Sequence, residues 1–219
     1  MRPLAPSLLN DFQVSLNDSL ALCANTEGLW LFAPPTSEIR RQLHVRQLEA
    51  LYEAAFLRIF TAWEGFLEAI TVRWMAGYCC PGYVPATPDG SRLCQTVRQA
   101  SVKLSMEHGR PRDYLLWHKP KTVEDRLKPH LLGSPLERLS VAEADWLTAV
   151  AAIRHDVAHR TPDTAAGYQA AAVYLTHRPA LPRPGQLLRQ ADIRDPLNQP
   201  KWILVFAETF RTHAVALVA

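Results

Sequence analysis

The sequence has few cysteines, few glycines and no long apolar run. Only four cysteines occur among 219 residues, and the adjacent pair Cys79-Cys80 is not a CxxC spacing, so neither a disulfide framework nor a tetrahedral zinc site is expected. The nine glycines form no phosphate-binding loop, which argues against an NTP-hydrolysing enzyme. The longest apolar stretches, Leu29–Pro35 and Trp202–Ala207, are far shorter than the ~20 residues that a membrane-spanning helix needs.

The overall composition is that of an ordinary globular protein. Hydrophobic residues make up 48% and charged residues 21% of the chain, and the formal net charge is +3. Disordered chains, collagens and coiled-coil rods are therefore excluded, whereas the mild positive charge permits an anionic partner without demanding one. Met1–Pro6 carries one charge and precedes no long apolar run, so we expect no secretory signal and a cytoplasmic protein that does not engage a membrane.

Apolar residues recur at helical spacing along most of the chain. A first helix is predicted from Ser7 to about Asn25. No proline lies between Thr36 and Pro81, and an apolar stripe fills that interval. The pattern predicts one helix of up to ~40 residues, about 60 Å long, with Thr36 or Ser37 as its N-cap. A helix this long overshoots a small bundle core, so its aromatic half is expected to be buried against a partner.

Shorter helices are predicted in the second half of the chain. Ser140-Val141-Ala142-Glu143 has the pattern of a capping box and starts the clearest of them. Thr161-Pro162 ends that helix, because the residue before a proline disfavours the α conformation. The other helices predicted here cover Leu93–Glu107, Lys121–Leu131, Gly167–Tyr174 and Lys201–Leu217.

The predicted fold class is all-α, since no alternating strand pattern exceeds a few residues. We expect a single domain over residues 1–219 with its core at about 36–178. A proline-punctuated connection over 179–200 then leads to a C-terminal helix over 201–217.

Positive charge is concentrated in two segments. Arg92–Lys128 has a net charge of +5 and Arg178–Lys201 a net charge of +3. Both segments are interpreted either as solvated loop surface or as contacts to a phosphate backbone, for which Lys119, Lys121 and Arg126 are candidates. Two aromatic residues of the first segment, Tyr114 and Trp117, are candidates for stacking on bases.

The run Ile-Arg-His-Asp-Val-Ala-His-Arg over 153–160 places strong polar groups at the end of an otherwise apolar helix. On a helical wheel Val150 and Val157 lie within about 60° of Arg154, so Arg154 projects from the apolar face. A guanidinium there must be paired or must line a wet cleft, because an unpaired buried charge costs several kcal/mol.

Two histidines of this run lie on the adjacent flank of the helix. His155 and His159 are about 40° apart, and Asp156 is near enough along the helix to orient His159 or Arg160. His159 is in the last turn, where the helix dipole stabilises a protonated imidazole by ~0.3–1 kcal/mol. An arginine that holds a phosphate beside a histidine that moves a proton suffices for metal-free RNA cleavage, because the ribose 2′-OH supplies the nucleophile.

The motif Arg154-His155-x-x-x-His159 resembles the R-x4–6-H motif of HEPN-superfamily ribonucleases, in which a polar residue often follows the arginine. The setting near the end of a late helix is similar too, and Trp63-Glu64-x-Phe66 on the long helix is similar to the early helix of those bundles. The resemblance spans about residues 36–178.

This resemblance implies a homodimeric HEPN-like bundle whose paired motifs form a composite, metal-independent endoribonuclease site without a cofactor. Arg154 would contact the phosphate and the transition state, His159 would be the acid/base, and His155 would shape the site. Asp156 and Glu64 would support them, and Arg160 would add a contact to RNA. Such proteins act as toxins or anti-phage effectors, which implies a neutralising antitoxin or a sensor protein as a further partner.

Geometry and chemistry leave alternatives open. On an ideal helix Arg154 and His159 are about 140° apart, so they serve one phosphate only if the helix loosens before Pro162 or a second protomer supplies a partner group. The polar run could instead be a structural network in which Glu64 or Glu68 neutralises the arginine, within a non-catalytic HEPN-like module. A third reading is a metal-dependent hydrolase, because His155-Asp156-x-x-His159 has the i,i+4 histidine spacing of helical zinc sites.

Overall fold

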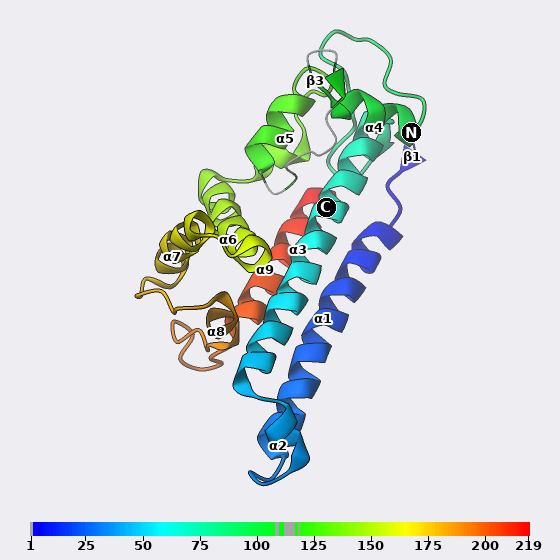
Figure 1. Cartoon of the computed structure of the whole chain (residues 1–219). Coiled ribbons are helices and arrows are strands. Elements are labelled where there is room, and N and C mark those ends of the chain that lie inside the picture. The colour runs from blue at the N-terminus through cyan, green and yellow to red at the C-terminus, as the bar shows by residue number, and fades with distance from the viewer. Residues whose placement is uncertain (1, 108–109, 112–116, 118) are drawn as a thin grey trace. The chain divides into compact units, whose positions relative to one another are not determined.

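A computed structural model describes the whole chain except residues 1, 108–109, 112–116 and 118 (Figure 1). The described residues are mostly helical. The first half contains α1 (Ser7–Phe32), α2 (Glu38–Gln42), α3 (Val45–Met75), α4 (Val97–Ser105) and α5 (Pro120–Leu127). The second half contains a 3₁₀ turn (Pro135–Arg138), α6 (Val141–His159), α7 (Pro162–Thr176), α8 (Pro184–Arg189) and α9 (Trp202–Val218).

Extended structure is confined to short pairs within the described part of the chain. β1 (Arg2–Pro3) pairs in parallel with β2 (Tyr78–Cys79), and β3 (Met106–Glu107) pairs antiparallel with β4 (Arg110–Pro111). The predicted all-α class is confirmed. Over the same described residues, no helix is both long and apolar enough to cross a bilayer.

The prediction of a single long helix after residue 36 is wrong, because the helical conformation is interrupted between α2 and α3. α2 ends at Gln42 and α3 begins at Val45. The His44 backbone N–H donates to Gln47 Oε1 at 2.6 Å, and the Arg46 N–H donates to His44 Nδ1 at 3.2 Å. These bonds satisfy backbone donors that the start of a helix leaves without an intrahelical partner, so α3 starts afresh here.

Caps account for other helix boundaries. Ser37 is the N-cap of α2 and accepts from the Arg40 N–H, as predicted. The predicted capping box is confirmed as well, because Glu143 N–H donates to Ser140 Oγ at 3.2 Å and Ser140 N–H donates to Glu143 Oε2 at 2.6 Å. α1 continues to Phe32, about two turns beyond the predicted end.

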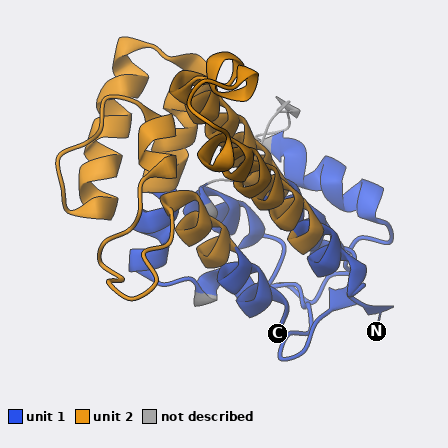
Figure 2. Ribbon diagram, turned by 90° about the horizontal axis from the view of Figure 1, so that it is seen from below, with its two compact units in different colours: residues 1–12, 63–148, 211–219 blue, residues 13–62, 149–210 orange. Residues whose placement is uncertain are grey.

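The chain forms two compact units, shown in different colours in Figure 2. Unit 1 comprises residues 1–12, 63–148 and 211–219, and unit 2 comprises residues 13–62 and 149–210. The boundaries fall inside α1, α3, α6 and α9, so each of these helices contributes residues to both cores.

Unit 1 is organised around aromatic side chains of α3 and its neighbours. Phe12 stacks on Phe66 with ring centroids 5.1 Å apart, and Trp63 lies 6.2 Å from the same ring. At the end of α3 the fully buried Trp74 meets Tyr83 edge to face at 5.7 Å. Burial of such side chains stabilises the fold by roughly 2–3 kcal/mol each.

Unit 2 has a second aromatic core between α3 and α9. Phe56 contacts Phe206 at 5.7 Å, and Phe60 meets Phe210 edge to face at 5.8 Å. These residues are fully buried. The α3 stripe that the sequence shows is therefore a core face in both units.

Candidate functional site

The Arg154–His159 motif lies on the last turns of α6, in unit 2. α6 is regular through His159, and the chain then turns at Arg160, which adopts a left-handed conformation with φ of 51°. Thr161 caps α7 and forms a capping box with Thr164, and Pro162 occupies the first helical position, where a missing N–H is harmless. α7 therefore begins five residues before the predicted Gly167, and α6 keeps its helical conformation through His159.

Arg154 is half-buried beside core residues. Ile153 and Val150 are fully buried and Val157 is nearly so, as the helical wheel predicts. Among the described residues Arg154 makes no hydrogen bond or ion pair. Its guanidinium is available to an anion that reaches this surface.

His155 and His159 are stacked on one flank of α6. Their ring centroids are 5.9 Å apart with an interplanar angle of 27°. His159 is exposed and His155 is half-buried. The i,i+4 spacing thus places two proton-transfer groups side by side.

Asp156 is committed to the α6–α7 junction. It is 7% exposed, and its Oδ1 accepts a hydrogen bond from Thr164 Oγ1 at 3.0 Å. Within the described residues its carboxylate bonds neither His159 nor the Arg160 side chain. The turn at Arg160 brings Thr164 to this carboxylate, and its predicted role in supporting the site stays a prediction.

Arg160 also has a partner within the fold. Its guanidinium forms an ion pair with Glu53 of α3, a carboxylate that is 6% exposed. The other oxygen of Glu53 accepts from the Gly185 N–H at 3.1 Å. Arg160 thus anchors the end of α6, although its side chain remains 66% exposed.

The segment predicted as a mere connection supplies further ion pairs to α3. Arg183 binds Glu49 with two hydrogen bonds of 2.8 and 3.0 Å, and this hydrogen bonding lowers the pKa of Glu49. A Cβ at Gly185 would lie 2.7 Å from the Glu49 carbonyl oxygen, so only glycine allows α8 to approach α3 this closely. Pro184 is the first residue of α8, so the prolines of this segment do not exclude a helix.

A third buried glutamate, Glu27 of α1, joins the same unit. It accepts from Arg189 at 3.0 Å and also binds Tyr52 and Lys201. Burial alone would raise the pKa of Glu27, but the bonds from Lys201, Tyr52 and Arg189 lower it overall. Glu27, Glu49 and Glu53 are not among the site residues that the sequence predicts. The i,i+4 spacing of the last two beside a core stripe was the available signal.

The remaining predicted site residues belong to unit 1. Glu64 is buried at 7% exposure. Lys119 is exposed just before α5, Lys121 pairs with Asp125 at 2.9 Å, and Arg126 is half-buried. Trp117 is buried at 4% exposure and is not presented for stacking on bases. Tyr114 lies outside the described residues.

Metal-ligating side chains do not gather at the motif. Over the described residues, no group of three or more His, Cys, Asp or Glu side chains could hold a metal ion. The HDxxH spacing brings the two histidine rings together, but the intervening Asp156 is bound to Thr164. The zinc reading lacks a third ligand in this part of the chain.

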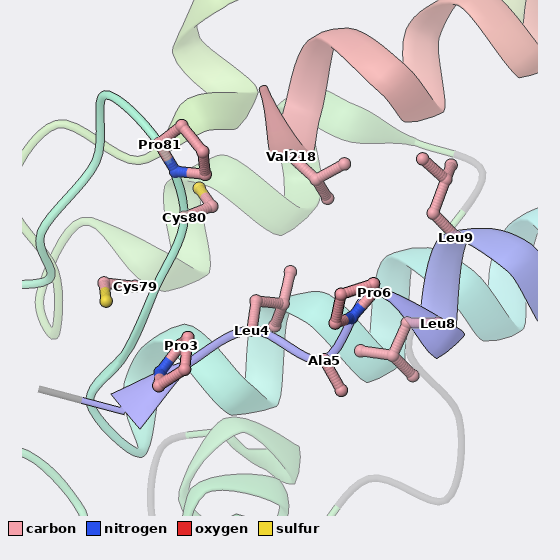
Figure 3. A pocket seen from close by; sticks show the side chains of 10 residues that line it. All are labelled: Pro3, Leu4, Ala5, Pro6, Leu8, Leu9, Cys79, Cys80, Pro81 and Val218. Carbon is pink, nitrogen blue, oxygen red and sulfur yellow. The ribbon is translucent and has the colours of Figure 1, made fainter.

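A separate cavity of about 460 Å³ lies in unit 1 (Figure 3). Leu4 and Pro6 line one side, and Cys80 and Val218 lie across from them. Its lining contains no charged side chain. It therefore offers nothing to neutralise a phosphodiester and is not a candidate for the cleavage chemistry.

Comparison with known proteins identifies no relative: no family model matches the chain, and neither a curated protein nor a solved structure is similar to it. The functional assignment therefore depends on the residues at the end of α6.

Proposed function

We propose that this protein is a metal-independent endoribonuclease of the HEPN type, acting at Arg154 and His159. The observation that carries the proposal is a contrast within one short segment. Asp156 and Arg160 are bound to Thr164 and Glu53, whereas Arg154 is without a hydrogen bond or ion pair among the described residues and His159 is exposed. Asp156 and Arg160 thus have partners within the fold, whereas the side chains of Arg154 and His159 are available to a ligand.

The proposed chemistry needs no nucleophile from the protein. His159 removes the proton of the ribose 2′-OH or donates one to the leaving 5′-oxygen. The 2′-oxygen attacks phosphorus while the bond to the 5′-oxygen breaks, which gives a 2′,3′-cyclic phosphate and a 5′-hydroxyl. Arg154 stabilises the negative charge on the phosphoryl oxygens, and His155 holds the His159 ring in place by stacking.

The regularity of α6 bears on how the site is completed. Because α6 is helical through His159, Arg154 and His159 keep the separation of about 140° expected on an ideal helix. We therefore propose that a second protomer contributes a group to each site, as in the composite site that the HEPN resemblance implies. A toxin or defence effector with a neutralising partner is the biological role that such an activity fits.

Cleavage of RNA in the presence of excess EDTA tests this proposal. We expect wild-type protein to cleave without metal and to leave 2′,3′-cyclic phosphate and 5′-hydroxyl ends. Arg154→Ala and His159→Ala should each reduce the rate by at least about 100-fold, and His155→Ala should reduce it less.

Matched controls are Arg58→Ala and His177→Asn, which change exposed residues outside the motif and outside the two basic segments. Asparagine is chosen because His177 has a positive φ of 54°. Equal activity of His159→Ala and wild type, with loss only in His155→Ala, would reverse the assigned roles. Absence of cleavage together with retained RNA binding would identify a non-catalytic module.

A further inference from the structure

An exposed apolar surface lies in unit 2 where α1 is followed by α2. Leu29 is 62% exposed, Phe32 is 90% exposed and Ile39 is 45% exposed. Together with Ala24, Asn25, Gly28 and Ala33 they line a hollow of about 600 Å³, here called the α1–α2 hollow. Figure 1 shows α2 at the C-terminal end of α1, which is where these residues lie. Large apolar side chains gathered in this way mark an interaction site.

The residues of α1 at this surface follow the spacing of a helix-pairing seam. Leu22, Asn25, Leu29 and Phe32 are separated by three, four and three positions, so they share one face. Leu22 is 42% exposed and Asn25 is also exposed. Apolar a and d positions with a single asparagine are typical of a seam that pairs with another helix, the asparagine setting register.

The α1–α2 hollow and Phe32, a side chain that could fill such a hollow in a second copy, are on the same surface. Gly28 leaves open space, since a Cβ placed there would meet nothing within 4 Å. Phe32, one turn further along α1, is almost fully exposed and forms a wall of that space. A two-fold axis through this face would let Phe32 of each copy enter the hollow of the other, so one contact buries both rings.

Charge at the edge of this surface is compatible with such a pairing. None of the residues lining the hollow is charged, so the occupant must be apolar. At the edge, Glu38 and Arg41 of α2 form an exposed ion pair of 2.6 Å. A surface that carries both signs beside one another can face its own copy with Glu38 opposite Arg41.

We infer that the α1–α2 hollow is a self-association surface, occupied by Phe32 and Leu29 of a second copy of this chain. The α6 motif contributes nothing to this surface, so the inference does not rest on ribonuclease activity.

Mass measurement by light scattering or sedimentation equilibrium at 5–200 µM, roughly the range in which weak dimers dissociate, tests the inference. Wild-type protein should associate to a multiple of its 24.6 kDa mass. Gly28→Met adds a long side chain at the hollow, at a position where a Cβ would meet nothing within 4 Å, and replaces glycine by a better helix former. It should reduce the mass of the assembly by a factor of two while circular dichroism stays unchanged.

Phe32→Glu should have the same effect, and Leu197→Glu is its matched control. Leu197 is 92% exposed and outside the hollow, so the control replaces a similarly exposed apolar side chain by glutamate and should leave the mass unchanged. A wild-type monomer of 24.6 kDa throughout the range overturns the inference. An assembly that survives both Gly28→Met and Phe32→Glu, or one that Leu197→Glu also disrupts, overturns it as well.

Discussion

Unit 2 presents two groups of cationic side chains that the fold treats differently. Arg160, Arg183, Arg189 and Lys201 each pair with a buried glutamate. Arg154, on the same unit and on a helix that packs apolar residues around it, makes no such pair among the described residues. The cations that pair with buried glutamates stabilise the unit, whereas Arg154 is available to a ligand.

The difference follows from where carboxylates occur in the sequence. Glu49 and Glu53 lie one turn apart on α3, and their partners come from residues 160–185. Since a buried carboxylate without a partner is costly, these two glutamates hold Arg160 and Arg183 in place. A cation without such a carboxylate beside it, such as Arg154, is expected to contribute little to stability.

The largest expected effect is on stability, from Arg183→Ala. It removes two hydrogen bonds from Glu49, which is 4% exposed, and leaves that carboxylate unpaired. The free energy of unfolding, measured by urea denaturation, should fall by more than in either of the other variants discussed below. Arg178→Ala, an exposed arginine of the same segment, is the control and should change it by less than about 0.5 kcal/mol. Equal effects of the two substitutions would contradict the structural role of the Glu49 pair.

A smaller effect is expected in the pH dependence of stability. The pKa of Glu49 is lowered from 4.5, chiefly by the hydrogen bonds from Arg183. A lowered pKa contributes stability that is fully present above pH 4.5 and is lost as the pH falls through the folded-state pKa. Urea midpoints measured from pH 6 to pH 3 should therefore fall less steeply in Glu49→Gln than in wild type. A steeper fall in the variant would show that this carboxylate is not stabilised by Arg183.

The smallest effect on stability is expected from Arg154→Ala, the substitution with the large effect on cleavage. Because Arg154 has no ion pair in the described part of the chain, its loss should change the free energy of unfolding by less than about 0.5 kcal/mol. Thermal and urea denaturation measure this directly. A loss comparable to that of Arg183→Ala would place Arg154 among the structural cations and would remove the main support for the ribonuclease proposal.

Local signals in the sequence predicted much of the fold. The apolar stripes of α3 and α6, the Ser140 capping box and the Ser37 cap act between residues three to four positions apart, so the sequence contains both partners. The errors arose where side chains decide a boundary. The absence of proline suggested one long helix, but hydrogen bonds of His44 and Gln47 start a separate helix, α3. Likewise, the capping box of Thr161 and Thr164 starts α7 at Pro162.

The candidate site was predictable in part. The motif itself and the i,i+4 stacking of His155 on His159 follow from helical spacing. The partners of Asp156 and Arg160 do not, because Thr164 is brought in by a turn and Glu53 is 107 positions away in the sequence. Long-range pairing of this kind depends on how helices pack, which periodicity does not encode.

The sequence alone therefore determined that the chain is helical, which faces of the main helices are apolar, and that an arginine and two histidines end α6. These properties depend on residue type and on spacing within one helix turn. Only the tertiary structure decided which polar groups have partners within the fold. The packing of α3, α6 and α8 in unit 2 provides buried carboxylates for Arg160 and Arg183 and none for Arg154 among the described residues, since the burial of a charge is a property of the packed fold.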